Sequence, residues 1–596
     1  MTPGARPGRV LLALVLSGLL VATLGPAGAA TADPAEAGPA RFDAPHPGFA
    51  PAATRLHDAT PVQAGLDPAP VRAALATVAA ATEPTTGPDG VVRPLTAGAV
   101  TVMAHDGAVV AREATGWAVR YADGQGTELP REQWVPAAED TVWDMASVSK
   151  LFTSVVLMQQ VEAGRVDLDA PVATYLPAFA ANGKADVTVR QLLTHTGGLP
   201  AWLPLHSAYP DRASRLAAVL AAAPVSGPGE QYLYSDIGMI TVGLVAEQVS
   251  GRDLDELVAD GITGPLGMTD TGYAPTGDVR DRAAATEFQT VPARGMVRGE
   301  VHDENAWSLG GVAGHAGVFS TAADMSVLAQ AVLNGGVYDG RRILSRASVE
   351  AMVTDENAAL PGQDHGLGFE LDQRWYMAGL SGPRTAGHTG YTGTSLVLDL
   401  SSRSFVLLLG NRVHPSREWG SVNPLRRAVA QGLALALAVP PRRGPTAWWA
   451  GAQDAATATL EVPVELPATG GRLGFDLFVD TDDSDVLALE ASSDAGATWR
   501  PVPFTTRGTG TRVRHEDGTV SASGHRTWWR AEAELARDDG AAGTLRLRWR
   551  YTTDATELGR GVLVDGVRVT TRGGQVLDGE RRPEVFTTTG WTAVER

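Results

Sequence analysis

Strand-like and helix-like segments follow one another along this chain in an order that few architectures can accommodate. Residues 98–119 alternate apolar and polar positions around a His-Asp-Gly turn, which predicts a β-hairpin. A long helical middle follows, and residues 366–371, 395–400 and 404–409 are strand-like again before a last helical run ends near Val439. Strands at both ends with helices between them predict an α+β domain, in which the hairpin and the late strands complete one antiparallel sheet covered by helices.

The composition changes at residues 440–449, PPRRGPTAWW. Beyond this point the sequence predicts short strands with alternating apolar and polar residues, such as residues 473–479 and 545–551, separated by Gly, Asp and Thr turns. At 596 residues the chain is too long for one core. We therefore expect an α+β domain over residues 61–440 and an all-β sandwich, jelly-roll-like, over residues 446–596.

The N-terminus has the pattern of an export signal. Two arginines precede an apolar run over residues 10–25, and small-residue cleavage sites follow near Ala29 and Ala32. We expect a signal peptide over residues 1–32, then an Ala/Pro-rich, mobile lead-in over residues 33–60. An uncleaved membrane anchor is the alternative. On the first interpretation the mature protein is secreted, with no membrane partner and a possible place at the cell wall.

Charge and cysteine content exclude several kinds of function. The net charge is −18 with no basic cluster, which argues against nucleic acid as a partner. There is no cysteine, so disulfides, thiolate metal sites and cysteine nucleophiles are excluded. No His-rich metal spacing is present, and acidic pairs such as Asp482-Asp483 have the pattern of solvated turns. We expect no metal, no cofactor and a monomer.

One lysine stands out in a chain whose cations are almost all arginine. Of 49 lysines and arginines only Lys150 and Lys184 are lysine, and Lys150 lies in the apolar helical run SKLFTSVVLMQQVEAG. Ser147, three residues earlier, shares its helix face and meets the positive field of the helix N-terminus. A buried lysine can act as an uncharged amine base toward such a hydroxyl, which arginine cannot do. The other interpretation is that a lysine stands at this position by chance.

The Ser-x-x-Lys pattern is the nucleophile motif of serine β-lactamases and penicillin-binding proteins, and this chain resembles their class C β-lactamase branch. That branch also holds esterases, D-amino-acid peptidases and carboxypeptidases. The resemblance spans about residues 65–439. Its further motifs are QLLTHTGGLP at residues 191–200, YLYSDIG at 232–238, GPLGMTDTGY at 264–273, AGHAGVFSTAADM at 313–325 and GHTG at 387–390.

The resemblance implies a role for each residue that matches a motif. Ser147 would be the acylated nucleophile, and Lys150 and Tyr234 would share proton transfer. The backbone N–H groups of Ser147 and Tyr391 would form an oxyanion hole. Substrate would bind at Asp236, His388, Thr389 and Gly390, with Gly390 small because substrate lies close to its strand.

Two departures from the family pattern bear on the substrate. Position 236 is Asp where the family has Asn, so it only accepts hydrogen bonds and favours the ammonium form of Lys150, shifting the base role toward Tyr234. His388 replaces the family's lysine, which leaves less fixed positive charge for a substrate carboxylate. Both changes favour an exported hydrolase of small-molecule esters, amides or peptides over an efficient β-lactamase.

A second function class stays open, namely a catalytically silent surface- or glycan-binding protein that keeps the fold. An α/β-hydrolase is disfavoured because no G-x-S-x-G motif occurs. The Gly-rich segment 299–317 carries His302, Asp303 and His315, which either line a pocket or, the interpretation we favour, tie the loop together. His195 is expected to organise its own loop.

The C-terminal strands resemble the jelly-roll module at the end of secreted immune-inhibitor-A-type peptidases. The matching segments are residues 494–499, 551–554 and 561–567. Half of the chain's 14 tryptophans fall after residue 447. Exposed rings could stack on cell-wall sugars, whereas core rings would indicate a role in stability or in docking onto the first domain.

Overall fold

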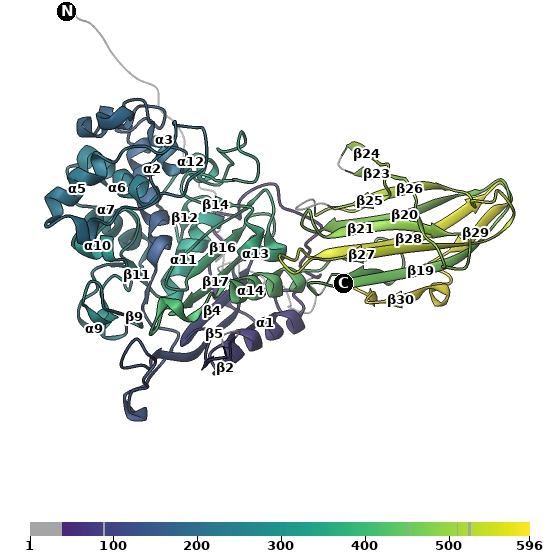
Figure 1. The fold of residues 1–596 in the computed structure, drawn as a ribbon, viewed down its shortest axis with the longest axis horizontal. Coiled ribbons are helices and arrows are strands. Elements are labelled where there is room, and N and C mark those ends of the chain that lie inside the picture. Colours follow the sequence, from purple (N-terminus) through teal and green to yellow (C-terminus); the bar gives the residue numbers. More distant parts are fainter. Residues whose placement is uncertain (1–37, 88–89, 452, 509, 522–525) are drawn as a thin grey trace, which may run out of the picture. The chain divides into compact units, whose positions relative to one another are not determined.

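The computed structural model describes residues 38–596 except 88–89, 452, 509 and 522–525, and residues 38–596 form one compact unit. Its central sheet has the strand order β1-β5-β4-β17-β16-β15-β14 (Figure 1). Those strands are β1 (His57–Asp58), β4 (Gly98–His105), β5 (Ala108–Val119), β14 (Glu370–Leu371), β15 (Thr385–Thr389), β16 (Ser395–Asp399) and β17 (Ser404–Gly410).

The two ends of the predicted α+β domain meet in this sheet. β17 runs antiparallel to β4, with Val406 opposite Met103, so the late strands join the early hairpin as expected. The predicted strand over 366–371 is shorter, because only β14 forms. Gly368 has a φ of +96° and its N–H donates to Leu193 O, which turns the chain away from the sheet before β14 begins.

Helices cover both faces of the sheet, and the period of two along β17 decides which residues meet them. Phe405, Leu407 and Leu409 belong to the core that includes the helix α2 (Ser149–Glu162). Val406 and Leu408 point the other way, into the core beneath α1 (Pro68–Ala81) and α14 (Asn423–Ala436). The sheet is therefore apolar on both faces, and the fold class is confirmed.

Helix α2 is buried along most of its length, as its apolar pattern predicts. Its buried residues run from Ser149 to Met158 without interruption, and it packs beside α6 (Asp236–Ser250). The helix stops where Gly164 takes a φ of +69°. Any charged side chain in the first turn of α2 is consequently held in a dry, fixed environment.

The part of the lead-in that the structure describes is packed rather than free. Phe42 and Phe49 are 1% and 6% exposed, and Phe42 N–H donates to Ala438 O at 2.7 Å. Two large aromatic side chains in a short segment give it enough apolar area to order it. The expected signal peptide, residues 1–32, lies outside the described residues. Within the described part of the chain, no helix combines the length and apolarity that a bilayer crossing requires.

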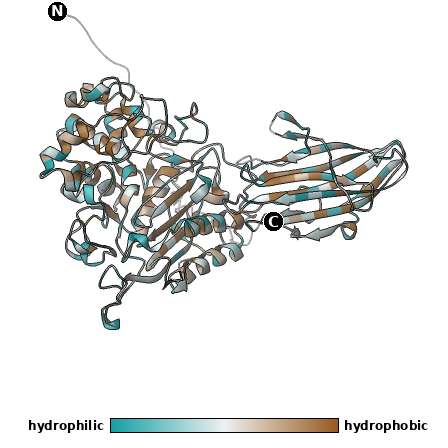
Figure 2. Ribbon diagram, viewed as in Figure 1, coloured by the Kyte–Doolittle hydropathy of each residue, from teal (hydrophilic) through white to brown (hydrophobic). Residues whose placement is uncertain are grey.

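The C-terminal region is all-β, as predicted, and forms two antiparallel sheets around a common core. One sheet is centred on β20 (Gly471–Asp480) and β28 (Gly561–Thr571), the other on β19 (Thr457–Leu466), β21 (Val486–Ser492) and β27 (Gly543–Thr552). Apolar and polar residues alternate along these strands (Figure 2). None of the seven tryptophans after residue 447, all of them described, is exposed.

Buried polar contacts join the C-terminal region to the α+β domain. Arg526 Nη1 lies 2.6 Å from Asp399 Oδ2, and Arg374 Nη2 lies 3.2 Å from Asp480 Oδ1. The rings of Phe42 and Phe478 pack edge to face at 6.3 Å. These contacts favour the docking interpretation of the C-terminal region over that of a freely tethered module.

Candidate functional site

Ser147 lies in a 3₁₀ turn, Ala146–Val148, that leads directly into α2. The residue before it, Ala146, has a φ of +47°, a left-handed conformation that costs free energy for any residue with a Cβ. Ala146 N–H donates to Asp144 Oδ1 at 2.8 Å, which helps to hold the strained turn. Strain of this kind persists where the surrounding structure enforces it, as expected around a nucleophile.

The turn before Ser147 is also tied to the turn that follows β15. Asp144 O accepts a hydrogen bond from Thr392 Oγ1 at 2.7 Å, and Met145 O accepts one from Thr394 Oγ1 at 3.1 Å. A Cβ on Gly390 would lie 2.5 Å from Met145 O. Glycine at 390 is thus required by the protein's own backbone, whereas we expected a close substrate to require it.

Lys150 is buried and donates to three acceptors. Its Nζ lies 3.0 Å from Ser147 Oγ, 3.1 Å from His315 O and 2.8 Å from Asp236 Oδ1. An ammonium carries three hydrogens, so each has an acceptor. Burial alone would lower the pKa of Lys150, but Asp236 and then Tyr234 outweigh it and raise that pKa above its ordinary value. Lys150 is therefore an ammonium here. It is not the uncharged base that we expected from a rare lysine in an apolar helix.

Tyr234 immediately precedes Ser235, which caps α6 by accepting from Gly238 N–H. Its ring centroid lies 4.8 Å from Lys150 Nζ, which brings the charged amine close to the phenol. Burial raises the pKa of Tyr234 to about 12, although Lys150 opposes the rise. The site therefore pairs a neutral phenol and a charged amine around one serine hydroxyl.

Two buried histidines stand beside Tyr234. His195 Nδ1 accepts from Ser235 N–H at 3.1 Å, and its ring lies 4.6 Å from that of Tyr234, so His195 organises its loop as expected. His388 is 1% exposed, and burial lowers its pKa to about 3. It lines neither cavity at the site, in contrast to the direct substrate contact expected of it. A neutral imidazole tolerates burial that a lysine ammonium without a partner would not.

Two cavities, of about 500 and 360 Å³, adjoin Ser147, and Ser147 and Tyr391 line both. The first cavity is also lined by Tyr232, Tyr234, Glu370, Thr389, Gly390, Arg412 and Arg426. The second cavity is also lined by Trp202, Asp236, His302, Asp303, Glu304, His315 and Arg417. The nucleophile thus stands at the junction of two differently charged spaces.

The first cavity contains two guanidinium groups and one carboxyl group. Arg426 Nη2 donates to Gly390 O at 2.6 Å, which fixes the turn that carries Tyr391, and Arg412 Nε donates to Tyr391 O at 3.0 Å. Burial raises the pKa of Glu370 to about 7. Among the described residues, Tyr391 N–H donates no hydrogen bond, so it is available to an oxyanion.

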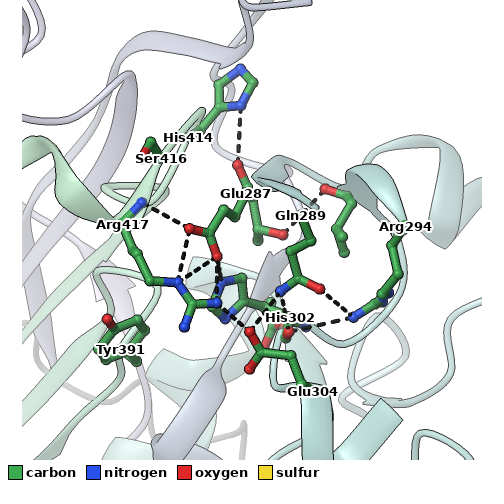
Figure 3. A network of polar contacts seen from close by, with 12 residues as sticks. Glu287, Gln289, Arg294, His302, Glu304, Tyr391, His414, Ser416 and Arg417 are labelled. Atoms are coloured by element: carbon green, nitrogen blue, oxygen red, sulfur yellow. Dashed lines mark hydrogen bonds and ion pairs between the residues drawn. The ribbon is translucent and has the colours of Figure 1, made fainter. Parts of the chain in front are cut away.

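A network of polar contacts supports Tyr391 from the side of the second cavity (Figure 3). Arg417 binds Glu287 and Glu304, and Glu287 also bonds His302 Nε2 at 2.8 Å. Although burial opposes it, hydrogen bonds from His302 and Arg417 lower the pKa of Glu287 to about 2. The His302 ring stacks on that of Tyr391 at 5.9 Å and 24°.

The segment 299–317 fits both interpretations, as a hydrogen-bonded loop and as part of a cavity wall. His315 Nε2 bonds Asp303 Oδ1 at 2.8 Å, so the histidines tie the loop, yet His302, Asp303 and His315 also line the second cavity. Sequence reasoning missed the groups that complete the site, which belong to no motif and, except for Asp144, lie far from Ser147 in the chain. They are Asp144, Glu287, Glu370, Arg412, Arg417 and Arg426.

One cluster of three aspartates among the described residues has the oxygen donors that a metal site uses. Ligand oxygens of Asp482, Asp485 and Asp554 lie within 4.8 Å of one another, far along the chain from Ser147. Asp482 Oδ1 accepts from the N–H groups of Ser484 and Asp485, and Asp485 Oδ1 accepts from Asp554 N–H. Hydrogen bonds within the turn account for the close approach of these oxygens.

Comparison with known proteins gives a consistent result. A family model described as Beta-lactamase matches residues 89–431. A relative from Escherichia coli strain K12, provisionally named a D-alanyl-D-alanine carboxypeptidase, is 33% identical over 350 residues, which is 52% of this chain and 78% of the relative. A Salmonella typhi protein of the same name is 31% identical over 54% of this chain and 80% of its own length.

Two solved structures superpose on part of this chain. A penicillin-binding-protein homologue from Caulobacter crescentus superposes with a TM-score of 0.48 at 22% identity, covering 62% of this chain and 99% of that one. A family VIII carboxylesterase gives 0.46 at 23% identity, covering 63% and 99%.

Proposed function

Since the chain belongs to the β-lactamase family and is a serine hydrolase, we propose that it cleaves ester, amide or peptide bonds through an acyl-enzyme on Ser147. The observation that carries this proposal is the contact of 3.0 Å between Lys150 Nζ and Ser147 Oγ, inside a buried first turn. The amine is charged, so the proposal assigns proton transfer to the phenol of Tyr234 and charge stabilisation to Lys150.

In the proposed acylation, Ser147 Oγ attacks the acyl carbon and passes its proton to Tyr234 Oη, while the neutral phenol passes its own proton to the leaving-group atom. The positive charge of Lys150 stabilises the negative charge that Ser147 Oγ and Tyr234 Oη share during this relay. The N–H groups of Ser147 and Tyr391 hold the oxyanion of the tetrahedral intermediate. Collapse of that intermediate breaks the bond to the leaving group, which takes its proton from Tyr234.

In the proposed deacylation, a water molecule takes the place of the leaving group. Tyr234 Oη accepts a proton from this water as it attacks the acyl carbon, while the phenol passes its own proton to Ser147 Oγ and the ester bond breaks. Tyr234 lines the first cavity and not the second. We therefore assign the leaving group, and later the water, to the first cavity.

The charges of the first cavity bear on the substrate. Arg412 and Arg426 offer guanidinium groups to an anionic or polar leaving group. The relatives at 31–33% identity carry a carboxypeptidase name, whose leaving group is an amino acid with a carboxylate. A peptide bond before a C-terminal residue thus joins simple esters as a substrate of the proposed enzyme.

We expect ester turnover with poor β-lactam hydrolysis. His388 stands at the position of the family's lysine but is buried and uncharged, so it offers no ammonium to a β-lactam carboxylate. Loss of one charged hydrogen bond lowers kcat/KM by about 10- to 100-fold. Rates with nitrocefin and p-nitrophenyl butyrate, measured side by side, check this expectation. Nitrocefin turnover faster than ester turnover contradicts it.

We also propose that the protein is exported. The support is the sequence alone, with two arginines before an apolar run and small residues at Ala29 and Ala32. The mature protein recovered from culture medium should begin just after one of these two alanines, as N-terminal sequencing will show. A protein retained in the cell with Met1 in place contradicts export.

A further inference from the structure

One wall of the first cavity is formed by two helices that also contact the C-terminal region. Gln373 and Trp375 line the cavity at the beginning of helix α13 (Arg374–Met377). Asn423 and Arg426 line it from the first turn of α14. Both helices are also bonded to the C-terminal sheets or to the segment that leads into them. The wall of the cavity is therefore not built by the α+β domain alone.

The side chain of Arg374 reaches the C-terminal region from between the two residues that line the cavity. Its Nη2 lies 3.2 Å from Asp480 Oδ1 at the end of β20, and the two side chains are 7% and 0% exposed. A Cβ on Gly559 would lie 2.6 Å from Arg374 Nη1, so the backbone at this glycine lies against the guanidinium. Since Arg374 is bonded to Gln373 and to Trp375, its position limits where those side chains point.

The same part of the C-terminal region holds α14. Gln431 Nε2 donates to Gly559 O at 2.9 Å, and Gln431 Oε1 accepts from Gly379 N–H, also at 2.9 Å, just after α13. Arg560, the next residue along the chain, donates from Nη1 to Ala434 O. The segment 559–560 thus contacts both helices that form the cavity wall.

Apolar packing lies behind these polar contacts. Tyr376 and Met377 of α13 belong to a buried core that also contains Phe478 and Leu563 from the C-terminal sheets. Trp375 packs against this core and meets the ring of Tyr376 edge to face at 4.7 Å. Side chains in such cores are close-packed, so a displacement of one is passed to its neighbours. A shift of the C-terminal sheets would consequently move the ring that lines the cavity.

We propose that the C-terminal region forms part of the substrate-binding apparatus, with Asp480 and Gly559 as positioning residues that hold the wall of the first cavity and so set which leaving groups the enzyme accepts. This inference rests on the proposed function, which assigns the leaving group to the first cavity. The helix that carries Lys150 packs on the other face of the central sheet. Weakening these contacts should therefore affect the binding of the leaving group and spare the reacting groups.

The test compares two esters with the same acyl group, p-nitrophenyl butyrate and methyl butyrate. The first places a ring in the first cavity, whereas the second releases only methanol. In Asp480→Asn we expect kcat/KM for the p-nitrophenyl ester to fall by about tenfold or more, mainly through KM, because binding of the ring is lost. Methyl butyrate turnover and labelling by a fluorophosphonate, which releases fluoride, should be nearly unchanged. Equal losses with both esters, or a loss with neither, overturn the inference.

Gln431→Leu is the second variant, and it decides the matter if Asp480→Asn does not fold. It keeps every charge and removes the bonds to Gly559 O and Gly379 N–H, so the same difference between the esters is expected. Arg596→Gln is the matched control, because Arg596 Nη2 also joins the two regions, at 2.6 Å, but does so at Gly65 O. Both esters should keep their rates in this control.

Hydrogen exchange measures the same positioning without turnover. In either variant the amides of residues 373–380 should exchange faster, whereas those of residues 149–158 in α2 should not change. If the unmodified protein hydrolyses neither ester, the proposed function fails, while the exchange pattern still decides this inference. Unchanged exchange over residues 373–380 overturns it. Failure of both variants to fold overturns it as well, because the contacts would then support the whole fold and not one cavity wall.

Discussion

Ser147→Ala should lower kcat/KM for p-nitrophenyl butyrate by about 10⁴- to 10⁶-fold and abolish labelling by a fluorophosphonate or a fluorescent penicillin. The substitution removes the only atom of the strained turn that can form the acyl bond. It leaves the contacts of Asp144 with Ala146 and Thr392 in place, so the turn should keep its shape. Steady-state rates and gel fluorescence of the two proteins measure the effect.

Ser154→Ala is the control for this experiment. Ser154 lies on the same helix, is buried, and its Oγ has no hydrogen-bond partner among the described residues. Its removal should change neither labelling nor rate by more than a small factor. Label that persists in Ser147→Ala refutes the assignment of the nucleophile. An unmodified protein that takes no label at all is instead the catalytically silent binding protein.

Tyr234→Phe should lower kcat/KM by about 10²- to 10⁴-fold, the usual contribution of a positioned proton carrier. Lys150 is held as an ammonium by Asp236, so it cannot replace the phenol as base. The loss should be larger for a p-nitroanilide than for a p-nitrophenyl ester, because the poorer leaving group depends more on protonation. Rates with the two substrates give the comparison.

Tyr232→Phe supplies the matched control, since Tyr232 lines the same cavity two residues earlier. Its phenol makes no contact with Ser147 in the proposed chemistry, and the variant should stay within tenfold of the unmodified protein. Equal losses in both variants would mean that the phenols shape the cavity and carry no protons. Full activity in Tyr234→Phe would move the base role to another group.

Periodicity predicted the elements that build the fold. The alternation over 98–119 became the hairpin β4–β5, and the uniformly apolar run after Ser147 became the buried α2. Short motifs then predicted which side chains meet, because Ser147 and Lys150 share one helix face and need no tertiary information to be neighbours. Tyr234 and Asp236 were assigned to the same site only through the family resemblance. Local spacing could not place them there, because a long segment separates them from Lys150 in the sequence.

The charge state of Lys150 could be anticipated only in part. Position 236 in the sequence already indicated that a carboxylate would favour the ammonium, but the three acceptors around Nζ depend on where the backbone of His315 lies. The Glu287–Arg417–Glu304 network was beyond prediction for the same reason. Its members come from segments more than a hundred residues apart, and only the folded chain brings them beneath Tyr391.

The number of C-terminal tryptophans does not predict whether their rings are exposed or buried. Seven tryptophans after residue 447 fitted either a sugar-binding surface or a packed core. Trp549 is fully buried, and Trp499 lies under Arg548 at 3.9 Å. None of these rings is fully exposed, and Trp448, Trp449 and Trp499 are half-buried, so glycan binding stays a prediction. Contacts such as Arg526 with Asp399 tie this region to the first domain.

Both lysines of the chain are enclosed by the fold. Lys150 is 1% exposed beside Ser147, and Lys184 is 0% exposed, with its amine capping the carbonyl groups of Ala181 and Ala222. The outer surface of the described chain consequently carries guanidinium groups as its permanent cations and presents no primary amine side chain. Cross-linkers, biotin esters and solid supports that couple through amines have only the terminal amino group to react with until the protein unfolds.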